Sequence, residues 1–407
     1  MEKYCLHKKS LIFCLLICNI FIFSCQEKLP IEIIENINKL PEKVDFNFHV
    51  KPILSDKCFA CHGPDSKKRK ANLRLDIDKG SISKTNGKIL TLKDIKSSLI
   101  NRLTSKDPRI KMPPPEFHLS LDNKEIATII KWIRQGGKYH PHWSFSPPIV
   151  EQSPPEDKSQ WSGNGIDYFI KKKLEKIGIN PALKASPETL IRRLSFTLKG
   201  LPPSLIEIDQ FINSPTSIAY ESLIDKYLNS PRYGELMANI WMDVARYADS
   251  DGYLDDKHRD FSPWRDWVIK AFNDNMTYEK FVTHQLAGDL IKNADQESIK
   301  ATAFNRLHKK NSEAGIIFEE YRSEYVADRT ITFGSAFLGM TLECARCHDH
   351  KYDPISQKNF YELSSFFNNT FEIGSAVYGP GQSPGPSLLL TSEKEQEVIK
   401  YIEEELE

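Results

Sequence analysis

Apolar residues recur every three to four positions through most of the second half of this chain. Such spacing places them on one face of a helix and predicts amphipathic helices. The predicted helices cover residues 166–178, 187–199, 205–213, 217–229, 235–248, 263–274, 278–291 and 318–340. Runs in which apolar and polar residues alternate are scarce, so little sheet is expected. We therefore predict a mainly α fold.

A smaller helical unit is predicted before this region, over residues 41–140. One helix is expected around 48–56. The clearest helix begins after Asp122, which can cap it together with Glu125. Its buried stripe is formed by four isoleucines: Ile126, Ile129, Ile130 and Ile133.

Proline, glycine and polar residues divide the chain. The predicted organisation is a signal segment at 1–24, a polar tether at 25–40, the small helical unit at 41–140, a proline-rich linker at 141–165, a larger helical domain at 166–371, and a loop with a charged helix at 372–407. The charged helical pattern still continues at Glu407, so we expect the chain to be cut short there.

The amino terminus has the features of an export signal. Lys3, Lys8 and Lys9 precede an apolar run of 13 residues at 11–23, which is too short to span a bilayer comfortably. Ser24 and Cys25 follow it and resemble a bacterial lipoprotein cleavage box. We expect an exported protein, either periplasmic or anchored to the outer membrane by a lipid on Cys25. The alternative is simple cleavage at a nearby site.

Two Cys-x-x-Cys-His pentads account for four of the eight cysteines: Cys58, Cys61 and His62, and Cys344, Cys347 and His348. Each pentad offers two thiols spaced for the vinyl groups of haem c and an adjacent imidazole for iron. A Cys-x-x-Cys pair alone could also be a redox dithiol or half a zinc site. The histidine and the export signal favour haem.

A haem at the first pentad needs a second axial ligand. Met112 is the best candidate, 50 residues after His62, because the prolines that follow it keep the backbone extended. His49 and His118 are competitors. Iron with histidine and methionine on its two faces suits electron transfer.

Several segments of the first unit resemble a known family. They are VKPIL at 50–54, KCFACHGPD at 57–65, KANLRLD at 70–76, and MPP at 112–114. They look like the planctomycete-type cytochrome c domain. That resemblance implies a small class-I-like cytochrome c fold, thioether bonds from Cys58 and Cys61, and iron ligation by His62 and Met112.

The larger unit resembles the uncharacterised helical domain that usually accompanies this cytochrome. The resemblance lies in SPRYG at 230–234, WMDVARYADS at 241–250, WRDWV at 264–268, QLAGDL at 285–290, and the stretch from 339 to 354. The activity of that domain is not settled. Its relatives usually continue into a further domain, so the resemblance implies the amino-terminal part of a longer multidomain protein.

The second pentad allows three interpretations. The favoured one is a second haem c on Cys344, Cys347 and His348, with a distal ligand from His258, His284, His308 or Met340. A zinc ion on Cys344, Cys347, His348 and His350 is the alternative. The third interpretation is a reducible disulfide between the two cysteines.

Charged residues add two ambiguous clusters. One contains Asp243, Arg246, Asp249 and Asp251, and the other contains Glu319, Glu320, Arg322, Asp328 and Arg329. Helix-surface ion pairs are the simpler interpretation of both. Acidic and basic residues number 55 each, so no pull toward nucleic acid is expected.

The leading hypothesis is an exported c-type cytochrome that transfers electrons to a redox partner protein within a larger periplasmic or surface assembly. The alternative is a haem-linked enzyme that acts on an extracellular substrate such as a polysaccharide derivative. Its catalytic residues are unknown. A non-enzymatic binding module with the cytochrome as sensor is a third class.

Overall fold

The computed structural model describes residues 29–77, 84–85, 88–89, 92–141, 143–147, 154, 161, 164–313, 315–375 and 385–406. The expected signal segment, including its apolar run and Cys25, lies outside these ranges. Within them, no helix combines the length and apolar character needed to cross a membrane. Contacts divide the chain into two units, Met1–Val150 with Asp349–Pro354, and Glu151–His348 with Ile355–Glu407.

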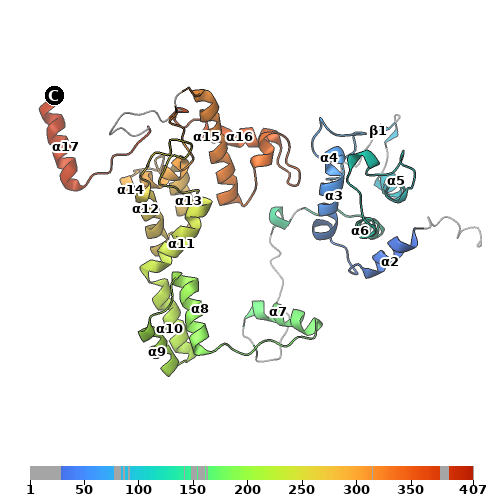
Figure 1. The fold of residues 1–407 in the computed structure, drawn as a ribbon, viewed down its shortest axis with the longest axis horizontal. Helices are drawn as coiled ribbons and strands as arrows, with labels where there is room; N and C mark the ends of the chain where they lie inside the picture. The colour runs from blue at the N-terminus through green and yellow to red at the C-terminus, as the bar shows by residue number, and fades with distance from the viewer. Residues whose placement is uncertain are drawn as a thin grey trace, which may run out of the picture. The chain divides into compact units, whose positions relative to one another are not determined.

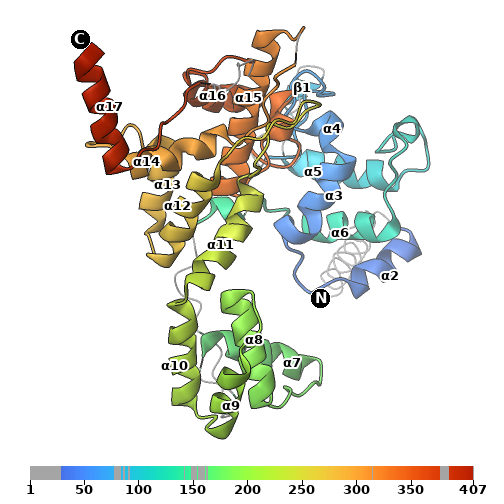
Figure 2. The same ribbon diagram turned by 60° about the vertical axis from the view of Figure 1, so that its left-hand side comes forward.

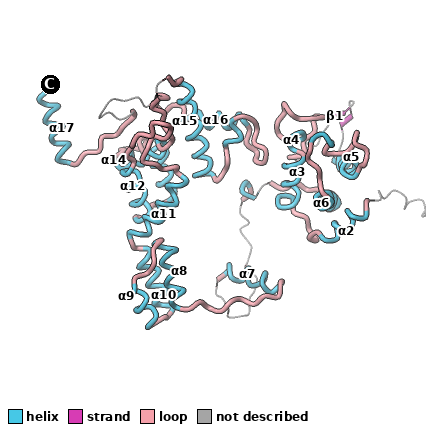
Figure 3. The backbone as a smooth tube through the Cα atoms, viewed as in Figure 1, coloured by secondary structure: helices cyan, strands magenta, loops and turns pink. Residues whose placement is uncertain are grey.

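Helices dominate both units, which confirms the mainly α prediction (Figure 3). In the described residues the only strands are β1 (Lys84–Thr85) and β2 (Lys88–Ile89), which pair antiparallel. The first unit contains α2 (Ile31–Lys39), η1 (Phe46–Val50), α3 (Lys51–Lys57), α4 (Phe59–His62), α5 (Leu92–Thr104), η3 (Pro115–Phe117), α6 (Asn123–Arg134) and η4 (Trp143–Phe145) (Figure 1).

Helix α6 forms as predicted. Asp122 accepts a hydrogen bond from the Glu125 backbone, and the Glu125 side chain accepts one from the Asp122 backbone, which completes a capping box. The helix buries Ile129 and Ile130 completely. Trp132 packs at its end against Phe46, with ring centroids 5.5 Å apart.

The prediction that residues 25–40 form only a tether is wrong for α2. Ile33 of this helix is 3 % exposed and belongs to the core of the first unit. Lys131 on α6 donates from Nζ to the carbonyls of Ile37 and Leu40, both at 3.2 Å. Packing against α6 thus stabilises a helix too short to be stable alone.

The second unit begins with α7 (Gly165–Lys176), α8 (Pro187–Lys199), α9 (Leu205–Asn213), α10 (Ser217–Leu228), α11 (Pro231–Val244), α12 (Ser262–Asn273) and α13 (Tyr278–Ala287). It continues with α14 (Gln296–Ala301), η5 (Thr302–Arg306), α15 (Phe318–Phe333), η6 (Gly334–Leu338), η7 (Glu343–Arg346), α16 (Gln357–Phe367) and α17 (Glu393–Leu406). In Figure 2, α8, α9 and α10 lie together, and α11 runs from them toward α12 and α13. Helices α14 and α16 were not predicted.

Two hydrophobic cores lie in the part of this unit from α11 onward. The larger one surrounds Trp264, Val268 and Phe304. The smaller one joins α15 and α16 to η7 through Ala327, Leu342, Ala345 and Phe360. The second pentad begins inside η7, so this smaller core positions it.

Candidate functional site

The first pentad forms a tight turn at the end of α3. The backbone N–H groups of Cys61 and His62 both donate to the Cys58 carbonyl, at 3.1 and 2.8 Å. Gly63 follows, where a Cβ atom would lie 2.3 Å from the Phe59 carbonyl oxygen. Only glycine fits this close approach without a backbone shift.

The loop after the pentad folds back onto it. Arg69 donates from Nε to the Gly63 carbonyl at 3.0 Å, which fixes its side chain to the protein. The Lys70 N–H donates to the Cys61 carbonyl, and the Leu75 N–H to the His62 carbonyl, both at 2.8 Å. These hydrogen bonds hold the loop at residues 69–75 against the end of the pentad.

The predicted haem residues line one cavity of about 200 Å³. Cys58, Cys61, His62 and Met112 all contribute to it. Its remaining walls are largely apolar and include Leu73, Leu75, Leu99, Leu103 and Phe117. The Met112 N–H donates to the Arg102 carbonyl at 3.0 Å, which holds the methionine segment beside α5.

Burial controls the protonation of this site. Burial, and then the neighbouring Cys61, raises the pKa of the Cys58 thiol to about 12. Burial lowers the pKa of His62, and the Arg102 charge acts in the same direction, while a backbone contact with Lys70 opposes them. Neutral imidazole is the form that binds iron.

The competing axial ligands are placed elsewhere. His49 accepts a hydrogen bond at Nδ1 from the Asp45 N–H, at 2.9 Å. Neither His49 nor His118 lines the cavity. Two thiols, one imidazole and one thioether in an apolar cavity match the donor set of haem c.

The second pentad lies in a different setting. Ala345 is fully buried, whereas Cys344 and Cys347 are exposed. Arg346 pairs with Glu324 on α15, with one N–O distance of 2.9 Å. Its carbonyl accepts from Gln357 at 3.2 Å and from the Tyr361 hydroxyl at 3.0 Å. These contacts fix the turn between α15 and α16 with both thiols at the surface.

The four candidate distal ligands occupy different environments. His308 has both ring nitrogens engaged, Nδ1 with the Lys309 carbonyl at 2.8 Å and Nε2 with Glu372 at 3.1 Å. His284 stacks on Trp267. His258 lines a separate cavity described below. Met340 packs against the small core that contains Ala345, so it is the candidate associated with the pentad.

The zinc and disulfide interpretations gain no support from the described residues. His350 accepts hydrogen bonds at Nδ1 from the backbone of Tyr352 and Asp353, at 3.2 and 2.9 Å. In that part of the chain no group of three Cys, His, Asp or Glu side chains is arranged to hold a metal ion. Its four cysteines, Cys58, Cys61, Cys344 and Cys347, are all free thiols.

Comparison with known families gives two matches, one on each side of the linker. The family model described as Planctomycete cytochrome C matches residues 58–116. The model described as PSCyt2, Protein of unknown function (DUF1549), matches residues 165–372, just over half of the 407-residue chain. The chain belongs to the DUF1549 family. The resemblance inferred from its motifs is thereby confirmed, and the cytochrome match supports binding of haem c. Searches of curated proteins and of solved structures returned no match.

The acidic residues of the DUF1549 region do not form one site. Arg246 pairs with Asp328 instead of Asp243 or Asp249, because α11 ends at Val244 and helical spacing stops there. Asp249 is exposed and accepts a hydrogen bond from the Tyr247 hydroxyl at 2.6 Å. Asp251 has no exposed surface and lies 3.3 Å from Arg259 Nε.

The interpretation of the second charged cluster as surface pairs holds only in part. Arg322 pairs with Glu319 at 2.6 Å as expected. Arg329, however, is 3 % exposed and pairs with Glu372. The signal for its burial was its spacing from Tyr325 and Val326, which occupy the buried face of α15.

Sequence reasoning missed the ionic network around Glu372. This carboxylate contacts His308, Lys310 Nζ at 2.6 Å, Arg306 Nε at 3.1 Å, and Arg329. Burial, followed by the charges of Arg306, Arg259 and Arg329, lowers the pKa of Lys310 to about 6. The charge of Asp251 opposes that shift.

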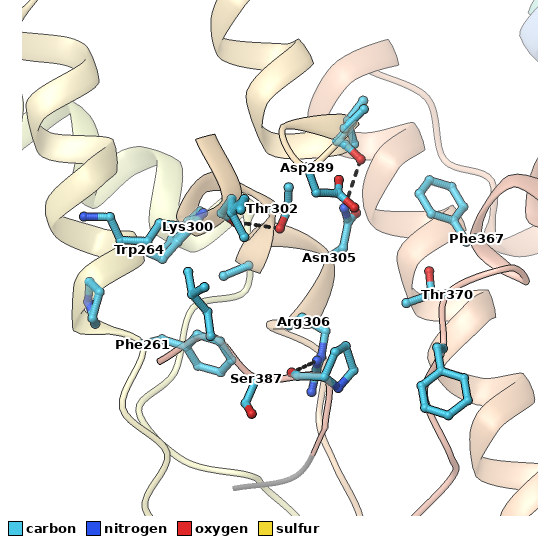
Figure 4. Close-up of a pocket in the computed structure, with 18 of the residues that line it drawn as sticks. Phe261, Trp264, Asp289, Lys300, Thr302, Asn305, Arg306, Phe367, Thr370 and Ser387 are labelled. Carbon is cyan, nitrogen blue, oxygen red and sulfur yellow. Dashed lines mark hydrogen bonds between the residues drawn. The ribbon is translucent and has the colours of Figure 1, made fainter. Parts of the chain in front are cut away.

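A cavity of about 1240 Å³ lies beside this network (Figure 4). Arg259 and Arg306 reach it from the network, and aromatic rings such as Phe261 and Phe367 form much of its wall. The acidic residues at its wall are Asp260 and Asp289. None of Asp243, Asp249 and Asp251, whose interpretation as ion pairs is the simpler one, lines it.

Proposed function

We propose that this chain is an exported c-type cytochrome that transfers electrons. The observation that carries the proposal is the shared cavity of Cys58, Cys61, His62 and Met112. Bound haem supplies an iron centre that gains and loses one electron. The apolar walls limit access of water to it.

The roles of the protein residues follow from their chemistry. Cys58 and Cys61 would hold the haem covalently, and His62 would offer a neutral imidazole to its iron. Met112 would offer a thioether, a ligand that stabilises reduced iron and raises its potential. Bound by an imidazole and a thioether of the protein, the iron would suit electron transfer better than binding of a substrate.

A second haem c at Cys344, Cys347 and His348 is part of the proposal. The surface position of both thiols supports it, because attachment requires access to them. Met340 is the preferred distal ligand. Zinc at Cys344, Cys347, His348 and His350 is the alternative outcome.

The proposed location rests on the amino-terminal sequence. The positive and apolar segments direct export, and lipid on Cys25 anchors the protein to a bacterial membrane, at the periplasmic or outer-membrane side. A redox protein is the expected partner, and the balanced charge argues against nucleic acid.

Haem content tests the proposal. The protein is secreted from a host with haem-attachment machinery, and its haem is counted by pyridine haemochrome assay and intact mass. We expect one covalent haem at the first pentad, which Cys58→Ser with Cys61→Ser removes, and a second if the other pentad is loaded. Secreted protein without covalent haem would refute the proposal.

The 1240 Å³ cavity favours a second candidate function. In this version, the DUF1549 region oxidises an extracellular compound, such as a polysaccharide derivative, and passes electrons to the cytochrome. Anaerobic addition of a substrate would then reduce the haem. A haem that stays oxidised with every extracellular glycan tested would count against this version and leave the cytochrome role intact.

A further inference from the structure

The large cavity of the DUF1549 region has the size of a site for an organic molecule. Its volume of about 1240 Å³ lies above the usual range for small-molecule sites, so it has room for a ring or chain. It is bounded by α12, η5, α16 and the segment at 385–390. Arg306 donates to the carbonyls of Gly385 and Pro386 and so holds that segment over the cavity.

The cavity wall is mainly apolar. In Figure 4, Phe261 and Phe367 lie on opposite sides of the view, with Arg306 between them. Phe371 and Leu388 extend the apolar surface. Walls of this kind bury the rings or hydrocarbon chains of a ligand, and a few polar groups fix the orientation of that ligand.

The charged groups at the wall include two exposed carboxylates, Asp260 and Asp289, and two largely buried cations of the network, Arg259 and Arg306. Arg259 is stacked over Phe261, 4.6 Å from the ring centroid, and Arg306 lies 3.1 Å from Glu372. Behind them, Glu372 is shared by three cationic side chains, those of Arg306, Lys310 and Arg329.

Among the residues that the structure describes, the buried charges of this network do not balance. Its cations are Arg259, Arg306, Lys310 and Arg329, and its carboxylates are Asp251 and Glu372. The cations remain in excess even when Lys310 is neutral. The nearby Arg246–Asp328 pair adds no net charge. Because buried excess charge is costly, an anion beside Arg306 would stabilise the region.

We propose that this cavity binds an organic anion, a carboxylate carried on an apolar ring or chain, with its charged end at Arg306 and Arg259. The site goes beyond electron transfer and does not require haem. Apolar walls hold the body of the ligand, and the excess positive charge selects its anionic end against neutral or cationic analogues.

Isothermal titration calorimetry with the full, haem-loaded chain tests the site. The probes are naphthoate, the neutral naphthamide, and the cationic naphthylmethylammonium. We expect saturable naphthoate binding that is roughly tenfold or more tighter than binding of the amide, and that weakens with added salt. No saturable binding of the cation is expected.

Three variants locate the binding. Arg306→Gln should weaken naphthoate binding by about tenfold or more, whereas Lys270→Gln, an exposed residue on α12 outside the cavity, should leave it unchanged. Leu388→Trp should block the cavity without altering the buried network. If circular dichroism shows that Arg306→Gln does not fold, Leu388→Trp still tests whether naphthoate binds in the cavity.

The outcomes are separable. The proposal fails if naphthoate shows no saturable binding, if the amide binds equally well, or if Leu388→Trp binds like the parent protein. Haem content measured on the same samples reports on the cytochrome proposal independently.

Discussion

The two pentads share their cysteine spacing and histidine but lie in different surroundings. The first opens into a small apolar cavity to which Met112, far along the chain, also contributes. The second is a turn fixed by α15 and α16 with both thiols exposed. The motif alone therefore supplies attachment chemistry, and the surrounding fold decides whether a cofactor pocket accompanies it.

Removing the thiols of each pentad gives the largest expected effect on this comparison. Cys58→Ser with Cys61→Ser should abolish the haem at the first pentad. Cys344→Ser with Cys347→Ser should leave that haem intact and remove at most one other. Haem per chain by intact mass makes the measurement. If Cys344→Ser with Cys347→Ser lost all haem while Cys58→Ser with Cys61→Ser kept it, the first pocket would not be the main site of haem attachment.

Changing the distal residue should alter the first haem without detaching it. Met112→His is expected to keep covalent haem and lower its reduction potential, since a second imidazole replaces the thioether that favours reduced iron. Spectroelectrochemistry gives the potential. His118→Ala is the matched control and should leave the reduction potential unchanged. If the potential shifted in His118→Ala and not in Met112→His, the ligand would be His118.

The buried network predicts a pH response specific to the second unit. The folded-state pKa of Lys310 is lowered from 10.5 to about 6, so between these values the unfolded chain binds more protons. Stability should therefore rise with pH across this window, by at most about 1.4 kcal/mol per pH unit.

Urea unfolding of this unit at several pH values measures that slope. Lys310→Met should flatten it, whereas Lys270→Met should not. An unchanged slope in Lys310→Met would mean that Lys310 stays charged beside Glu372.

The smallest expected effect concerns the turn of the second pentad. Arg346→Ala removes the pair with Glu324 and should cost about 0.5–1 kcal/mol of unfolding free energy, because the pair is partly exposed. Thermal unfolding measures it. Lys358→Ala, which breaks the exposed pair with Glu362, should cost less and serves as control. Equal costs would show that Arg346 does not fix the turn.

Local sequence signals predicted much of the fold. Helices α8 and α9 begin and end where their apolar spacing and capping residues predict. The cavity at the first pentad was accessible to sequence reasoning because cysteines, histidine and a proline-flanked methionine are rare and chemically specific. Short α2 was missed because its stability depends on contact with α6.

The ionic network could not be predicted in the same way. Asp251, Arg306, Arg329 and Glu372 come from separate loops and helices, and none has a local pattern that marks it as a partner of the others. Their burial arises from tertiary packing, which overrides the ordinary expectation that charged residues are exposed.

The residues between the paired cysteines are more than spacers. Phe59 is 5 % exposed in the core of the first unit, whereas Ala345 has no exposed surface in the smaller core of the second. A phenyl ring at position 345 would overfill a space shaped for one methyl group, and alanine at position 59 would leave a void. The two dipeptides therefore cannot be exchanged, and a library that randomised both while keeping every thiol and imidazole would recover different residues from each.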